Sequence, residues 1–74
     1  MDLKEFAIKW RSVTLSGEDE KLSLLKEFLA HRLDETYLVP GKGEIKLREM
    51  FENAEWHGYL LHVGNNLAEE GEKE

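Results

Sequence analysis

The sequence predicts one small all-α domain, a bundle of three or four helices over residues 1–68, followed by an acidic and disordered tail over residues 69–74. Two observations predict the bundle: apolar residues recur at helical intervals in two N-terminal segments, and each segment opens with helix-capping residues. A chain of 74 residues has room for only one modest core. The tail is predicted because four of its six residues are glutamate.

The first predicted helix covers residues 3–13. Asp2 and Glu5 have the spacing of a capping box, in which the first side chain accepts a hydrogen bond at the open N-terminal turn. A stripe at helical intervals then follows, made of Leu3, Phe6, Ala7, Trp10 and Val13. This stripe predicts that one face of the helix is buried.

The second predicted helix covers residues 17–33. Ser16 is the expected cap, and the acidic residues 18–20 fill the first turn, where the helix dipole favours negative charge. The apolar face is the clearest in the chain and consists of Leu22, Leu25, Phe28, Leu29 and Leu33.

The segment around Pro40 has two interpretations. Val39 precedes proline and therefore favours an extended backbone, and residues 40–43 have the composition of a turn. In one interpretation residues 37–39 and 44–47 form a short β-hairpin around Pro40, which with the two N-terminal helices gives an α+β fold. In the other, a third helix begins near Glu44 and the bundle is all-α.

The segment after Asn53 carries two apolar stripes on opposite sides of a helix. The earlier stripe contains Leu47, Met50, Phe51 and Ala54, and the later one contains Trp56, Leu60, Val63 and Leu67. We expect either a break within residues 53–57, giving a third and a fourth helix, or one central helix covered on both sides. A strand through residues 59–63 is a minor alternative, and Gly58 and Gly64 weaken any helix here.

Charge is distributed unevenly along the chain, whose net charge is −6. Residues 1–48 contain nine basic and nine acidic residues, whereas residues 49–74 contain seven acidic residues and one lysine. The acidic C-terminal third would repel phosphate, which disfavours direct nucleic-acid binding. The absence of cysteine and of any long apolar run favours a cytoplasmic protein that does not enter membranes.

Candidate catalytic and metal-binding groups are few. His31 and Glu35 have the spacing of a helical ligand pair, but a catalytic zinc needs three protein ligands and no third is near in sequence. Neither a helix nor a strand aligns His57 well with His62, so half-buried imidazoles are the simpler interpretation. We therefore expect no enzyme activity, no metal and no cofactor.

Aromatic residues nominate an interaction site. Trp56 and Tyr59 are the first candidates and Trp10 and Arg11 form a second, because Trp, Tyr and Arg dominate the energetics of protein interfaces. The alternative is that both tryptophans belong to the core, since so small a domain needs large apolar residues inside.

These patterns predict a non-enzymatic protein–protein interaction module, a regulator, adaptor or inhibitor that binds another protein or a second copy of itself through an aromatic and aliphatic helical face. One alternative is an acidic inhibitor that imitates nucleic acid on its partner, using the C-terminal carboxylates. A second alternative is a nucleic-acid-binding protein, using the basic residues of the N-terminal half, Lys4, Lys9, Arg11 and Lys26.

Overall fold

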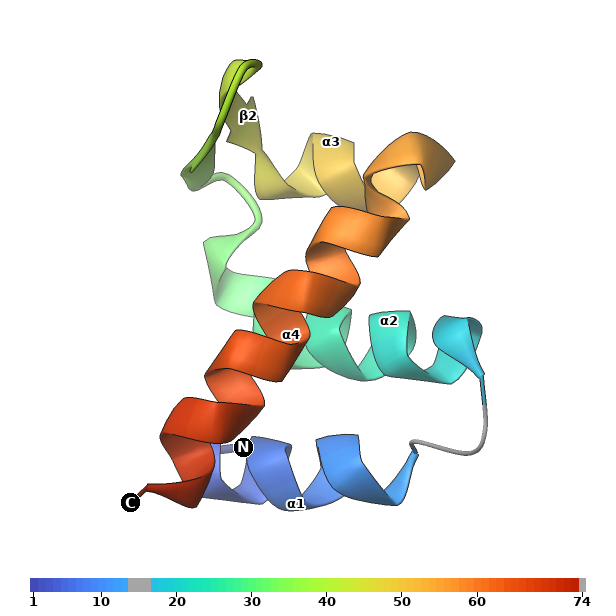
Figure 1. The fold of residues 1–74 in the computed structure, drawn as a ribbon, viewed down its shortest axis with the longest axis vertical. Coiled ribbons are helices and arrows are strands. Elements are labelled where there is room, and N and C mark those ends of the chain that lie inside the picture. Colours follow the sequence, from blue (N-terminus) through green and yellow to red (C-terminus); the bar gives the residue numbers. More distant parts are fainter. Residues whose placement is uncertain (14–16, 74) are drawn as a thin grey trace.

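Two helices, a β-hairpin and two further helices follow one another along the chain (Figure 1). The computed structural model describes residues 1–13 and 17–73. Over these residues the elements are α1 (Leu3–Ser12), α2 (Glu18–Phe28), η1 (Ala30–Arg32), β1 (Thr36–Val39), β2 (Gly43–Lys46), α3 (Leu47–Glu52), η2 (Ala54–Trp56) and α4 (His57–Glu72). The structure therefore has the hairpin of the α+β alternative as well as four packed helices, so the all-α bundle is supported only in part.

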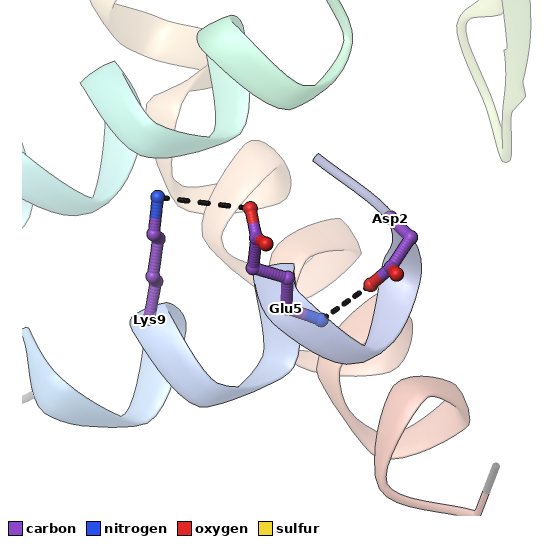
Figure 2. A network of polar contacts seen from close by, with 3 residues as sticks. All are labelled: Asp2, Glu5 and Lys9. Atoms are coloured by element: carbon purple, nitrogen blue, oxygen red, sulfur yellow. Dashed lines mark hydrogen bonds and ion pairs between the residues drawn. The ribbon is translucent and has the colours of Figure 1, made fainter.

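The capping prediction for α1 is confirmed. Figure 2 shows Oδ1 of Asp2 accepting a hydrogen bond of 2.7 Å from the backbone N–H of Glu5. One turn further on, the Glu5 carboxylate lies 3.8 Å from Nζ of Lys9. The cap satisfies a backbone donor that the first helical turn would otherwise leave open.

The second helix is shorter than predicted. It begins after Gly17, whose φ is +104°, and the expected cap Ser16 lies outside the described residues. It ends at Phe28, and the chain tightens into η1, where the Arg32 N–H donates to the Leu29 carbonyl three residues earlier. The buried Leu29 anchors the end of α2 in the core. The 3-10 turn of η1 then leads the chain toward the hairpin.

The hairpin has the position predicted around Pro40. Tyr37 pairs with Ile45 and Val39 with Gly43 in an antiparallel register. The turn uses Gly41 and Gly43, whose φ angles are +81° and +85°, a conformation that glycine adopts without steric cost. Tyr37 and Val39 therefore share the face of β1 that points toward the rest of the molecule.

The break between α3 and α4 is confirmed at Asn53. The backbone of this residue is extended, and its side-chain oxygen accepts a hydrogen bond of 3.2 Å from the Glu55 N–H. Because the chain turns here, both apolar stripes reach the core: Leu47 and Met50 from α3, and Leu60 and Val63 from α4. A strand through residues 59–63 is not present, since these residues lie within α4.

Helix α4 runs diagonally across the molecule and ends beside the N-terminal end of α1 (Figure 1). It continues to Glu72, beyond the predicted boundary at residue 68, so residues 69–72 are part of the helix instead of a disordered tail. The reason is contact with α1, because Gly71 is buried against the Leu3 carbonyl and the Ala7 side chain. Arg11 of α1 also forms an ion pair with Glu72.

The core lies between the helices and contains six fully buried large side chains: Phe6, Leu25, Leu29, Leu47, Met50 and Leu60. Phe6 stacks on Phe28, with ring centroids 4.5 Å apart, and so joins α1 to α2. Within the described residues, no helix is long and apolar enough to cross a lipid bilayer.

Candidate interaction surface

A hollow of about 340 Å³ lies between the hairpin and α4. We call it the hairpin–α4 hollow, and it is lined by Tyr37, Pro40, Tyr59, His62, Val63, Asn66, Leu67 and Glu70. Most of these side chains are aromatic or aliphatic, and a few polar groups lie among them. A largely apolar concavity with a few polar groups is typical of binding sites in proteins.

Helical spacing brings the α4 side of the hollow together. Tyr59, Val63, Asn66 and Glu70 follow one another at intervals of four, three and four residues, which places them along one face of a helix. The hairpin supplies the opposite side through Tyr37, on the inward face of β1. The hollow is therefore built from two segments, β1 with its turn and α4, which are separated along the chain by β2, α3 and η2.

Burial makes the phenol of Tyr37 a weaker acid than a solvent-exposed tyrosine. Loss of contact with water raises the pKa of its phenol above 10.0, because the charged phenolate is poorly solvated there. The charge of Arg32 acts in the opposite direction, whereas Glu35 and Glu70 raise the pKa further. Tyr37 therefore presents a neutral ring and hydroxyl to the hollow at physiological pH.

His62 and its neighbours form the outer edge of the hollow. The imidazole ring is tilted against the Tyr59 ring, with centroids 6.3 Å apart. Nδ2 of Asn66 lies 3.3 Å from Nε2 of His62, so the amide donates to the imidazole when that nitrogen is unprotonated. These contacts hold two exposed polar side chains, His62 and Asn66, beside the half-buried tyrosine rings of the hollow.

Trp56 lines a different hollow from Tyr59. Its half-buried side chain lines a smaller hollow of about 220 Å³ with Lys42 and Glu55. The two residues that the sequence nominated together therefore line different hollows: Tyr59 lines one with Pro40, and Trp56 lines the other with Lys42. Both are partly accessible, and their role in binding stays a prediction.

The second nominated pair does not form a patch. Trp10 is only 3% exposed, and its indole Nε1 donates a hydrogen bond of 2.9 Å to Oδ1 of Asn65. Arg11 is exposed and pairs with Glu72 at the edge of α1 and α4. Trp10 is therefore a core residue and not part of an exposed interaction site. For this residue the alternative interpretation, in which the tryptophans belong to the core, is the one that the structure has.

The histidines occupy ordinary positions. His31 lies in η1, outside an α-helix, and both it and Glu35 are exposed. In the part of the chain that the structure describes, no three His, Cys, Asp or Glu side chains are grouped to hold a metal ion. His57 is half-buried, and its Nε2 lies 3.2 Å from the Phe51 carbonyl, where a protonated nitrogen donates to that oxygen.

The basic residues of the N-terminal half lie on different surfaces. Lys4 and Arg11 line a hollow of about 310 Å³ at the end of α4, whereas Lys26 lines another on α2, with Asp19 and His57. Lys9 pairs with Glu5. These four basic side chains are therefore divided between α1 and α2, and nucleic-acid binding through them stays a prediction.

Sequence reasoning did not nominate Tyr37, Pro40 or Glu70. The i, i+4, i+7, i+11 series from Tyr59 to Glu70 was a usable signal for one side of the hollow. The hairpin side had no such signal, because only the fold brings Tyr37 against α4.

Comparison of this chain with family models, with curated proteins and with solved structures gives no match.

Proposed function

We propose that this protein is a non-enzymatic interaction module, a regulator or adaptor that binds a partner protein through the hairpin–α4 hollow. The observation that carries the proposal is the hollow itself, in which Tyr37 and Tyr59 face the same concavity of about 340 Å³. Tyrosine rings supply large contact areas at a small cost in side-chain entropy, and they are frequent at interface centres.

The mechanism is insertion of one partner side chain between the hairpin and α4. Three aliphatic groups, Pro40, Val63 and Leu67, provide apolar contact, and Asn66 and Glu70 provide polar contact at one side. The walls of the hollow come from a hairpin with a defined register and from a continuous helix. Such a preformed site loses little conformational entropy when the partner binds.

Cellular location and the nature of the partner belong to the same proposal. The absence of cysteine supports a cytoplasmic role, because a reducing compartment gives no benefit from disulfides. The partner is another protein or a second copy of this chain. A small domain with limited core area gains stability from either.

Affinity capture with matched variants tests the proposal. Tyr59→Ser removes one aromatic wall of the hollow, whereas Ile8→Ser changes an apolar residue on α1 that is 64% exposed and lies outside it. We expect a captured partner to be retained by wild type and Ile8→Ser and lost by Tyr59→Ser, with circular dichroism showing that all three are folded. Equal capture by folded Tyr59→Ser would contradict the proposal.

Light scattering over a concentration series separates self-association from binding of another protein. If the partner is a second copy, wild type and Ile8→Ser dimerise and Tyr59→Ser is monomeric. If all three are monomers, the capture experiment alone identifies the partner. Turnover of a substrate that His57→Ala abolishes would contradict the non-enzymatic assignment.

A further inference from the structure

The hairpin–α4 hollow combines two features that together select a class of ligand. The first is the pair of tyrosine rings, Tyr37 and Tyr59. The faces of aromatic rings carry negative charge density and attract cations within about 6 Å. The second is the carboxylate of Glu70, which lines the same hollow. A cationic group would therefore meet favourable electrostatics from both features.

Within the described residues, no ion pair joins Glu70 to a lysine or an arginine. Among residues 1–13 and 17–73, the ion pairs are Lys9 with Glu5, Arg11 with Glu72, and Arg48 with Asp34. Arg32 acts on Tyr37 through its charge, but it does not line the hollow. Among the residues that the structure places, no lysine or arginine lines the hollow beside Glu70.

The other lining residues fit the stem of a long basic side chain. Lysine and arginine carry three or four methylene groups that pack on apolar surface while the charged end remains near polar groups. Pro40, Val63 and Leu67 offer such a surface next to Glu70. A purely apolar side chain would remove the Glu70 carboxylate from water without compensation, and an acidic side chain would be repelled by it.

Resting on the proposed function, we infer that the hairpin–α4 hollow binds a lysine or arginine side chain of a protein partner, with the stem over Pro40 and Leu67 and the charged end beside Tyr37 and Glu70. Charge complementarity supports this occupant beyond the hollow. Residues 49–74 carry seven acidic residues and one lysine, and such a surface draws a basic segment toward it.

Nuclear magnetic resonance titration of the full ¹⁵N-labelled chain tests the inference. The probes are N-acetyl-arginine methylamide and, as a neutral control of nearly the same shape, N-acetyl-citrulline methylamide. We expect the arginine probe to shift amide signals of residues lining the hollow and to bind about fivefold more tightly than the citrulline probe, because only it gains the cation–π and carboxylate interactions.

Two charge-matched variants locate the contact. Glu70→Gln removes the carboxylate in the hollow, whereas Glu69→Gln makes the same change at an exposed neighbour that does not line it. We expect Glu70→Gln to weaken arginine binding about fivefold and Glu69→Gln to leave it nearly unchanged. Tyr37→Leu should weaken arginine binding while retaining apolar contact.

Three results would overturn the inference. In the first, the arginine-induced shifts are spread over all acidic residues and are equal in Glu70→Gln and Glu69→Gln. In the second, the arginine probe causes no shifts. In the third, N-acetyl-leucine methylamide shifts the same amide signals as strongly as the arginine probe does. This last result would leave the proposed function standing, because partner capture with Tyr59→Ser tests that function separately.

Discussion

The two sides of α4 differ in how they are covered. Toward α1 the helix presents Gly64, Ala68 and Gly71, and the two helices touch so closely that added methyl groups would collide. Toward the hairpin it presents Tyr59, Asn66 and Glu70, and a hollow remains. These sides lie nearly opposite each other, because residues of a helix advance by about 100° each.

The difference shows how one helix can serve stability and recognition at once. Small residues let backbones approach and exclude water, so the α1 side contributes packing. Large side chains on the other face cannot close against a two-stranded hairpin, so part of their surface stays accessible. We therefore expect substitutions on the α1 side to change folding and those on the hairpin side to change binding.

The largest effect is expected from Trp10→Ala. Trp10 packs against Phe6, with centroids 5.5 Å apart, and against Gly64. Truncation of a buried tryptophan leaves a cavity and costs about 3–5 kcal/mol. It also leaves Asn65 without the indole donor. A domain of this size has a free energy of unfolding of roughly 4–11 kcal/mol, so the variant should be marginal or unfolded in a urea titration followed by circular dichroism.

Trp10→Phe is the control for that substitution. It keeps an aromatic ring in the core and removes the hydrogen bond to Asn65, so the loss should be clearly smaller than for alanine. A loss below about 1 kcal/mol for Trp10→Ala itself would show that α1 and α4 are not packed through this ring.

A glycine pair on α4 gives the next largest effect. A Cβ at Gly64 would lie 2.6 Å from Cζ2 and 2.8 Å from Cζ3 of Trp10, whereas a Cβ at Gly58 would meet open space. Gly64→Ala should destabilise by about 1–3 kcal/mol through overpacking. Gly58→Ala should stabilise by about 0.5–1 kcal/mol, since alanine is the better helix former. Shifts of the same sign in urea titrations of both variants would refute this contrast.

In the sequence, Gly58 and Gly64 both weakened the prediction of a helix, yet both lie within α4. For Gly64 the structure gives the reason. Helix propensity describes only the local free-energy cost of glycine at position 64. The close packing of the Trp10 ring on Gly64 offsets that cost. The same contact logic extends α4 past residue 68, since Gly71 contacts α1. Sequence patterns do not report such long-range contacts.

Local signals were more informative. Asp2 and Glu5 predicted the start of α1. The opposed stripes around Asn53 allowed either a break or one central helix covered on both sides, and the structure has the break. The residues after Pro40 were compatible with either a hairpin strand or the start of a third helix. In the structure residues 43–46 pair with residues 36–39, which gives the hairpin. Of the nominated surface residues, Trp10 is buried because its ring fits over Gly64, a partner 54 residues away that periodicity cannot identify.

On the hairpin side, Tyr59→Ser should have a modest effect on folding. Tyr59 is half-buried and lies at the edge of the core, so its truncation should cost about 1 kcal/mol and leave the helical circular dichroism spectrum intact. The same substitution is expected to abolish partner binding. If Tyr59→Ser unfolds the chain as Trp10→Ala does, the two sides of α4 are not functionally distinct.

The smallest effect is expected at Tyr37 and appears only at alkaline pH. Burial raises the pKa of its phenol in the folded protein above 10.0, the value of the unfolded chain, and the opposing charge of Arg32 does not cancel this. The folded state therefore holds the proton more tightly, so the contribution of Tyr37 to stability is complete below pH 10 and declines as the pH rises through the folded pKa. Urea titrations at about pH 9 and about pH 11 should show a larger loss of stability for wild type than for Tyr37→Phe, which cannot ionise. Equal losses in the two proteins would mean that the Tyr37 phenol is fully solvated, and the hairpin would then not close against α4 as it does in the hollow.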